Sequence, residues 1–167
     1  YSNNLLLSVE ALAALKKVQA ELNQKGLGLK IFDAYRPQRA VNYFVAWCAD
    51  EADTANKLIY YPNLAKTDLL PGGYIAAQSG HSRGSTLDLT IVELSTGEEL
   101  DMGTPWDYFG PESWGSYEGI SSAQKQNRQL LADIMAKHGF KPLPEEWWHF
   151  TLANEPYPDT YFDFVVE

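Results

Sequence analysis

Hydrophobic side chains recur at intervals of three or four residues near the start of the chain, and this spacing predicts a helix. The apolar face of this helix would consist of Ala11, Leu15, Val18 and Leu22. Ser8 is a preferred residue for the N-cap, and Gly26 suits the left-handed conformation in which many helices end. The apolar run over residues 27–33 predicts that a short buried strand follows.

Two more segments have helical periodicity. The turn at residues 36–37 precedes a helix that we expect to end near residue 50. The apolar positions of this second helix are Val41, Phe44, Val45 and Cys48. Ser121 and Gln124 have the spacing of a capping box, which predicts a third helix that ends at Gly139. The apolar positions of the third helix are Leu131, Ile134 and Met135.

Apolar and polar residues alternate over residues 87–94, and this alternation predicts a strand with Asp88 on its polar face. A turn at residues 95–98 is expected to lead into a partner strand near residues 99–102. Residues 103–120 would then form a long loop that is rich in aromatic residues. Loops of that length in a small domain tend to be functional.

The last part of the chain completes the predicted fold. Pro142 and Pro144 break the chain, and a final strand is expected over residues 147–152. Residues 51–78 are expected to be irregular. Helices and strands in this order predict an α+β fold with a central, largely antiparallel sheet flanked by helices. Because no repeat or linker divides the sequence, residues 1–167 are expected to form a single domain.

The composition fits one globular domain and argues against a nucleic-acid-binding protein. With 167 residues, of which 45% are hydrophobic, the chain is long enough to bury a core. A net charge of -9 disfavours nucleic acid, which binds clusters of lysine and arginine. The single cysteine, Cys48, excludes an internal disulfide and a cysteine-based zinc site. We expect its thiol to be buried and inert.

The sequence leaves the compartment undecided between cytoplasm and periplasm. No apolar run approaches the ~18 residues that span a bilayer, so no membrane span is expected. The chain opens with Tyr1 and Ser2, without an initiator methionine or a basic signal-peptide region. We therefore expect a trimmed N-terminus, from which an export signal could have been removed.

Two of the three histidines lie near carboxylates in separate segments. His81 lies seven residues before Asp88, and Gly84 permits the bend that would bring a loop histidine and a strand aspartate to one metal ion. With His149 they offer two imidazoles and one carboxylate, a set that holds zinc and leaves a fourth position open for water. The same set also holds iron or other divalent metals.

Glu146, three residues before His149, is placed to act as a general base and later to protonate a leaving amine. Trp147 and Trp148 are expected to wall this site. The residue types alone leave a second interpretation open. In that interpretation the histidines are hydrogen-bonded core residues, Asp88 binds a neighbouring backbone group, and Glu146 is a surface charge.

The metal-ligand segments resemble the signature of the zinc D-Ala-D-Ala metallopeptidases, a group that also contains lysostaphin-type enzymes and the Hedgehog signalling domain. The matching positions are Ser79-x-His81-x-x-Gly84-x-Thr86-x-Asp88 and Glu146-x-x-His149. The match is closest to D-Ala-D-Ala dipeptidases of the VanX type, whose D-x-Y-R-P-x-R-A-V-N segment is similar to residues 33–42. Residues 60–63, 155–158 and 161–164 also match in order, and Thr86 replaces the alanine that is usual in the family.

The resemblance implies a Hedgehog/DD-peptidase-like fold and the zinc-dependent hydrolysis of D-Ala-D-Ala to two D-alanines. It assigns one Zn²⁺ per chain to His81, Asp88 and His149. It gives Glu146 the role of general base. This hydrolase would act on a cell-wall dipeptide, with peptidoglycan metabolism and antibiotic resistance as its setting.

Three further residues receive roles toward the substrate from the same resemblance. Arg36 would stabilise the oxyanion that forms at the peptide carbonyl, a task suited to a fixed guanidinium in a dry site. Asp107 would bind the free amine of the dipeptide. Ser79 would add a hydrogen bond at the same end of the substrate.

The family also sets alternatives. Its members carry several tens of residues before the first helix, including a tyrosine that helps close the substrate pocket, and this chain is expected to lack them. Related activities are a D,D-carboxypeptidase or a peptidoglycan endopeptidase, and a non-catalytic zinc-binding or peptidoglycan-binding module is a further alternative. A bacterial source is implied. The oligomeric state and the biological role, whether glycopeptide resistance, wall recycling or nutrition, stay open.

Overall fold

The computed structural model of this chain describes residues 4–166. Its helices and strands are α1 (Val9–Asn23), β1 (Leu27–Asp33), α2 (Gln38–Ala49), α3 (Lys57–Tyr60), β2 (Thr86–Glu93), α4 (Ser122–Lys137), β3 (Phe140–Leu143) and β4 (Glu146–Leu152). Short 3₁₀ turns lie at Lys66–Asp68, Gly80–Arg83 and Pro111–Ser113. Within the described residues, four strands form an antiparallel sheet in the order β1-β2-β4-β3. This architecture confirms the predicted α+β class.

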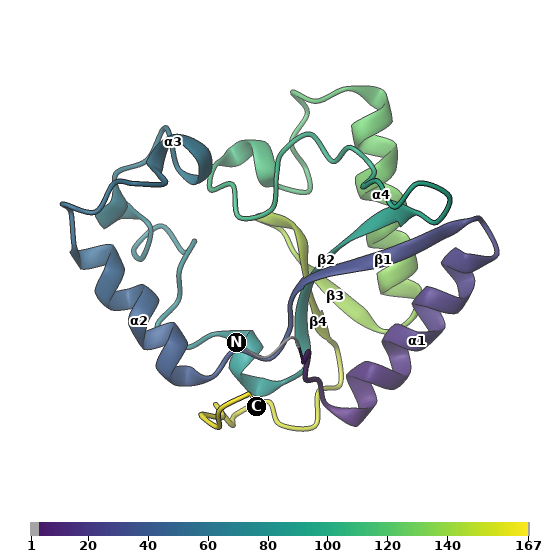
Figure 1. Cartoon of the computed structure of the whole chain (residues 1–167), viewed down its shortest axis with the longest axis horizontal. Coiled ribbons are helices and arrows are strands. Elements are labelled where there is room, and N and C mark those ends of the chain that lie inside the picture. Colours follow the sequence, from purple (N-terminus) through teal and green to yellow (C-terminus); the bar gives the residue numbers. More distant parts are fainter. Residues whose placement is uncertain (1–3, 167) are drawn as a thin grey trace.

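The sheet stands between two groups of helices (Figure 1). Helices α1 and α4 pack against the sheet and against each other, and with its strands they form the main hydrophobic core. The largest fully buried side chains of this core are Trp148, Phe150, Leu22, Leu87, Leu89, Ile91, Leu131 and Met135. Helices α2 and α3 lie on the other side of the sheet in this view, where Cys48, Tyr61 and Leu69 form a smaller core.

Helices α1 and α4 begin where their capping residues predict. Ser8 Oγ accepts a hydrogen bond of 3.2 Å from the backbone N–H of Ala11 at the start of α1. Ser121 and Gln124 form the predicted capping box at the start of α4. Gly139 has a φ of 91° just after α4, as expected for a residue that ends a helix. The predicted starts of α1 and α4 are confirmed, because a capping side chain bonds to a backbone group within one turn of the helix.

The turn that we predicted after β2 forms, with Gly97 at a φ of 77°, but the partner strand that follows it is shorter than predicted. Glu99 pairs with Val92 in a single antiparallel bridge, and the N–H of Leu100 donates a hydrogen bond of 2.9 Å to the carbonyl oxygen of Ile91. The longer pairings of β2 are with β1 and β4. Strand β3 was not predicted, because it contains Pro142. It lies at the edge of the sheet. There the missing N–H of a proline costs no hydrogen bond between strands.

Burial also differs from the prediction in two strands. Strand β1 is mostly half-buried, whereas β2 is buried on both faces over Thr86–Ile91. The polar residue Asp88 is therefore enclosed and not solvent-facing. Cys48 is buried as expected, and burial raises the pKa of its thiol. None of the helices in the described part of the chain is long and apolar enough to cross a membrane.

Candidate metal centre and active site

Three neighbouring strands bring one residue each into a row across the sheet. Asp88 of β2 lies between Asp33 of β1 and His149 of β4. Residues paired in this way have their side chains on the same face of the sheet. An irregularity in β1 between Ile31 and Asp33 shifts the register by one residue and places Asp33 opposite Asp88. The sheet therefore gathers two carboxylates and an imidazole at one point.

His81 reaches this point from the 3₁₀ turn that precedes β2. Ser79 caps the turn, because its Oγ accepts a hydrogen bond of 3.2 Å from the backbone N–H of His81. Gly84 ends the turn with a φ of 79°, which is the bend expected between His81 and Asp88. His81 Nδ1 donates a hydrogen bond of 2.7 Å to the carbonyl oxygen of Ala34. In the neutral imidazole this bond leaves Nε2, which faces Asp88, as the nitrogen that can bind a metal ion. Burial lowers the pKa of His81, but the charge of Asp88 outweighs it and raises the pKa.

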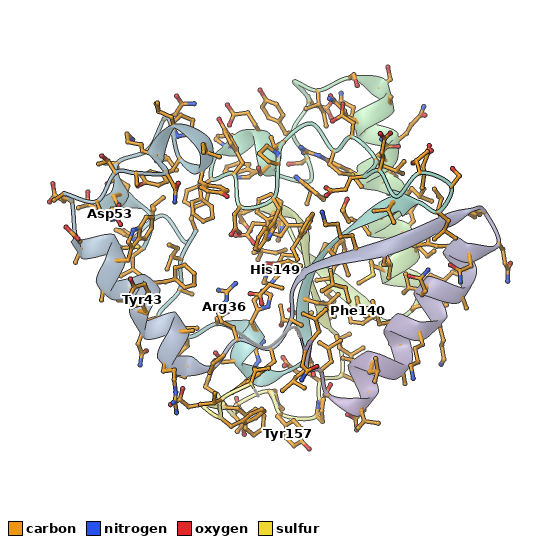
Figure 2. The ribbon with its side chains drawn as sticks, viewed as in Figure 1. Arg36, Tyr43, Asp53, Phe140, His149 and Tyr157 are labelled. Atoms are coloured by element: carbon orange, nitrogen blue, oxygen red, sulfur yellow. The ribbon has the colours of Figure 1, made fainter. Side chains whose placement is uncertain are left out.

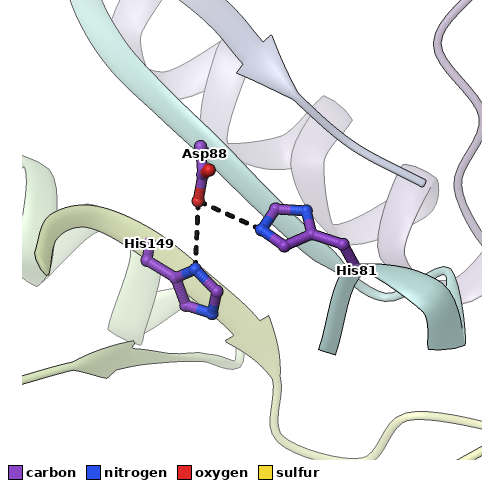
Figure 3. A group of neighbouring side chains, drawn as sticks. All are labelled: His81, Asp88 and His149. Atoms are coloured by element: carbon purple, nitrogen blue, oxygen red, sulfur yellow. Dashed lines mark ion pairs between the residues drawn. The ribbon is translucent and has the colours of Figure 1, made fainter. Parts of the chain in front are cut away.

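The two histidines and Asp88 converge on one oxygen atom, as Figure 3 shows. Asp88 Oδ1 lies 3.3 Å from His81 Nε2 and 3.1 Å from His149 Nδ1. One ligand atom from each residue lies within 4.8 Å of the other two. Ligand atoms bound to a tetrahedral zinc ion at ordinary distances are about 3.3 Å apart. The spacing of the three side chains is thus suited to a single divalent metal ion.

Hydrogen bonding and charge also suit a cation at this place. Asp88 Oδ1 is buried and accepts no hydrogen bond from any residue in the range 4–166, a state that proteins rarely leave uncompensated. Burial disfavours the charge of Asp88, but His81 and His149 outweigh it and hold the pKa of Asp88 well below its usual range. Burial lowers the pKa of His149 and so favours the neutral imidazole that a metal ion requires.

Glu146 lies beside this group, at the start of β4. Its Oε2 is 3.5 Å from His149 Nδ1. Burial raises the pKa of Glu146 to about 8, and the nearby carboxylates of Asp88 and Asp107 act in the same direction. A carboxyl group in this position can exchange a proton with a reactant bound beside His81, Asp88 and His149.

Arg36 supplies a fixed positive charge to the same site. Asp33 Oδ2 accepts hydrogen bonds from Arg36 Nε at 2.8 Å and from its NH2 nitrogen at 2.6 Å. Burial opposes the charge of the guanidinium, but Asp33 outweighs it and raises the pKa of Arg36. The guanidinium also lies 5.3 Å from the centre of the Phe44 ring. Arg36 is therefore charged and held from two sides.

Asp107 reaches the site from the long loop after β2. It has a φ of 60°, a left-handed conformation that is uncommon for a residue other than glycine and is often found at functional sites. Burial raises the pKa of Asp107 to about 7, with a further contribution from Asp88. The loop thus places a second carboxyl group of raised pKa near the candidate metal ligands.

Apart from Asp33, these side chains line one cavity of about 610 Å³. Its polar wall contains each predicted site residue: Arg36, Ser79, His81, Asp88, Asp107, Glu146 and His149. Its opposite wall is largely aromatic and comes from α2, α3 and neighbouring loops: Tyr43, Phe44, Trp47, Tyr60, Tyr61, Tyr74 and Phe109. In Figure 2, Arg36 and His149 lie near the centre, between α2 and the sheet. The structure therefore brings together all seven residues that the sequence singled out.

Two tryptophans do not lie where we expected them. Trp147 and Trp148 are buried in the main core and do not line the cavity. Two residues that we did not single out contact the site instead. Asp33 holds Arg36, and its place three residues before Arg36 was the available signal. Trp106 donates a hydrogen bond of 3.3 Å from Nε1 to Asp88 Oδ2, and nothing in its spacing pointed to this contact.

Comparison with known proteins finds relatives along the whole chain. A family model described as D-ala-D-ala dipeptidase matches residues 1–167. The D-alanyl-D-alanine dipeptidase of Enterococcus faecalis is 44% identical over 167 residues, which cover 99% of this chain and 83% of that protein. The enzyme of the same name from Streptomyces coelicolor has the same identity and coverage. The one from Escherichia coli is 33% identical over 149 residues, 89% of this chain and 67% of that protein.

Two solved structures share the fold. VanYB in complex with D-Alanine-D-Alanine has a TM-score of 0.54 at 15% identity and covers 92% of this chain and 75% of that chain. The vancomycin resistance D,D-pentapeptidase VanY in complex with Zn(II) has a TM-score of 0.53 at 14% identity, with 92% and 76% coverage. At such low identity the likeness concerns the fold alone, and it agrees with the α+β architecture described above.

Proposed function

The chain belongs to the D-Ala-D-Ala dipeptidase family, whose model matches residues 1–167, and we propose that it is a zinc-dependent dipeptidase that hydrolyses D-Ala-D-Ala to two D-alanines. Membership of this family makes the chain a metallopeptidase. The observation that carries the proposal is the convergence of His81 and His149 on the unpaired Oδ1 of Asp88, inside a cavity.

The metal and the general base form one part of the proposed mechanism. We assign one zinc ion to His81, Asp88 and His149, which would leave a fourth position open. When bound, zinc activates water and polarises a carbonyl group. Glu146, whose carboxyl lies 3.5 Å from the ligand nitrogen of His149, would accept a proton from the attacking water. It would then donate that proton to the leaving amine, so that it returns to its starting state.

The remaining polar residues of the cavity act on the substrate. Arg36 would stabilise the negative charge that develops on the peptide oxygen, because its guanidinium is fixed in advance by Asp33. Asp107 would form a charge-assisted hydrogen bond with the ammonium group of the free dipeptide. Ser79 would donate its hydroxyl hydrogen at the same end of the substrate.

The direct test is an assay of the purified, zinc-loaded protein for D-alanine released from D-Ala-D-Ala. We expect activity that disappears when a chelator removes the metal and returns when zinc is added. L-Ala-L-Ala serves as the control substrate, because it has the same composition and the opposite configuration. A zinc-loaded protein that releases no alanine from D-Ala-D-Ala would contradict the proposal.

The size of the cavity supports a second candidate function. A volume of about 610 Å³ lies in the range of about 300–1,000 Å³ that is typical of sites for drug-sized ligands. Such a cavity can accept a longer peptide, as a D,D-carboxypeptidase or a peptidoglycan endopeptidase requires. Asp107 favours the dipeptidase, since a buried carboxylate is left unpaired when the substrate amine is blocked. A non-catalytic binding module has no need of Arg36 and Glu146.

A further inference from the structure

We propose that Trp106 is a positioning residue of the metal centre, which holds one oxygen of Asp88 so that the other oxygen faces the metal. The proposal rests on the proposed function only in taking His81, Asp88 and His149 as metal ligands. It requires no particular substrate.

The two oxygens of Asp88 have different surroundings. Oδ1 faces the two imidazoles, at 3.3 Å from His81 and 3.1 Å from His149. Oδ2 accepts the hydrogen bond of 3.3 Å from the indole N–H of Trp106. A buried carboxylate can otherwise rotate or offer both oxygens to a metal ion. A donor on Oδ2 alone favours binding through Oδ1 and satisfies the oxygen that the metal does not use.

The indole of Trp106 is itself held in place. Its ring stacks on the ring of Phe32, with ring centres 5.1 Å apart and an angle of 9° between the planes. Phe32 lies where the register of β1 shifts, directly before Asp33. The stacking thus connects the loop that carries Trp106 to the strand beside Asp88. An indole fixed in this way gives its N–H a defined direction.

Buried contacts at its base also anchor this loop. Arg128 of α4 is buried and donates hydrogen bonds to the carbonyl oxygens of Met102, Glu112 and Trp114, at 2.7, 2.9 and 2.8 Å. These three carbonyls lie on both sides of Trp106 in the sequence. Because Asp107 follows Trp106 directly, the same stretch of backbone carries the contact to the ligand and the carboxyl group that we assign to the substrate amine.

The experiment compares Trp106→Phe with Trp147→Phe. Phenylalanine at position 106 keeps an aromatic ring to stack on Phe32 but removes the N–H. Trp147 offers a matched control, because its Nε1 donates a hydrogen bond of 2.8 Å to Thr104 Oγ1 in the same loop and to no metal ligand. Zinc affinity is measured by competition with a chelator, and the unfolding temperature of each metal-free variant is recorded.

We expect Trp106→Phe to raise the Kd for zinc by about 10- to 100-fold, the usual effect of removing a hydrogen bond to a metal ligand. Trp147→Phe should leave the Kd unchanged even if it lowers the unfolding temperature. The spectrum of the cobalt-loaded protein should change in Trp106→Phe alone, since it reports the geometry of the ligands. An unchanged Kd in Trp106→Phe, or an equal rise in both variants, would overturn the proposal.

A second variant keeps the test decisive if Trp106→Phe does not fold. Phe32→Leu retains the N–H of Trp106 but removes the ring that orients it, so the Kd for zinc should again rise. A Kd equal to that of the unmutated protein would overturn the proposal. The metal measurements are independent of turnover. An unmutated protein that binds zinc tightly but does not cleave D-Ala-D-Ala would refute the proposed function and leave the role of Trp106 intact.

Discussion

Asp88 is the residue on which the candidate metal centre depends, because its Oδ1 faces both imidazoles. Asp88→Asn keeps the shape of the side chain but removes the charge that attracts a divalent cation. We expect zinc content and dipeptidase activity to fall together in this variant, and likewise in His149→Ala. Metal analysis and activity should be measured on the same dialysed sample. Full zinc occupancy in either variant would show that the altered residue is not a ligand.

A variant of Glu146, the proposed general base, can distinguish a loss of catalysis from a loss of metal binding. Glu146→Gln should bind zinc and fold normally, but kcat should fall by roughly 10²–10⁴-fold, the range expected when a positioned acid-base group is lost. Glu145→Gln is a matched control, because Glu145 is its direct neighbour and is exposed. Steady-state kinetics on zinc-loaded samples would measure both. A kcat close to normal in Glu146→Gln would exclude this residue as the general base.

Asp107 should make the stability of the metal-free protein depend on pH. Burial raises the pKa of Asp107 to about 7 in the folded state, while an unfolded aspartate has a pKa of about 3.9. Between these values the folded state binds the proton more tightly, so the free energy of unfolding falls as pH rises. The slope from this group is at most ~1.4 kcal/mol per pH unit, and it ends above about pH 7.

The measurement is urea unfolding of the metal-free protein and of metal-free Asp107→Asn between pH 4 and pH 8. Asparagine cannot ionise, so the stability of the variant relative to the unmutated protein should grow as pH rises through this window. A stability difference that stays constant across these pH values would mean that Asp107 ionises normally in the folded protein.

Among the elements, those with local signals could be predicted from the sequence and those with remote partners could not. Helices α1 and α4 carry their own caps, at Ser8 and at Ser121 with Gln124. Strand β2 also has a clear pattern, but its pairing with β1 and β4 depends on chain closure over long distances. We therefore predicted the local turn after β2 correctly, expected a longer partner strand than the single bridge at Glu99, and missed the edge strand β3.

In the candidate site, too, some residues could be predicted from the sequence and others could not. The seven residues that we assign to the candidate site were predicted from the family resemblance, after the residue types of His81, Asp88 and His149 had indicated a metal site, and all seven line one cavity. The contacts that hold them were not predicted. Asp33 faces Asp88 only because of the register shift in β1. Trp106 reaches Asp88 from a loop whose path depends on contacts with α4. Such contacts leave no periodic pattern in the sequence.

Arg128 of α4 should control the stability of that loop. Burial lowers the pKa of Arg128 to about 10, and its guanidinium is held by three backbone carbonyls. Arg128→Gln would leave buried acceptors unpaired, at about 1–3 kcal/mol each. We expect the free energy of unfolding to fall by at least about 2 kcal/mol, and KM for D-Ala-D-Ala to rise because the loop carries Asp107.

A matched arginine provides the control for this prediction. Arg39 pairs with Asp163 at 3.0 Å, but its side chain is 58% exposed. An exposed ion pair contributes about 0–1 kcal/mol, so Arg39→Gln should change neither stability nor KM much. Urea unfolding and steady-state kinetics of both variants would decide the matter. Equal losses of stability in the two variants would contradict the prediction that the buried hydrogen bonds of Arg128 stabilise the loop.

In the whole molecule, the site lies between two separately packed parts. The main core lies between the sheet and helices α1 and α4. It fixes the positions of Asp88 and His149, because β2 and β4 carry these two candidate ligands and contribute to this core. The smaller core around Cys48, Tyr61 and Leu69 holds the aromatic wall of α2 and α3. Arg36 lies in the segment that joins these parts and is tied to the sheet by Asp33. The cavity is therefore defined by both cores.

We expect the residues that line this cavity, and Asp107 above all, to determine which length of peptide the protein accepts. The ammonium group of a free dipeptide can pair with the buried carboxylate, whereas an N-acetylated dipeptide or a stem pentapeptide would leave that carboxylate desolvated and unpaired. We therefore expect D-Ala-D-Ala to be hydrolysed, and N-acetyl-D-Ala-D-Ala and stem pentapeptides to be hydrolysed poorly. Asp107→Ala should raise KM for the free dipeptide and narrow its advantage in kcat/KM over the N-acetylated form. If the unmutated protein hydrolysed both forms equally well, the carboxypeptidase function would be the better account of this cavity.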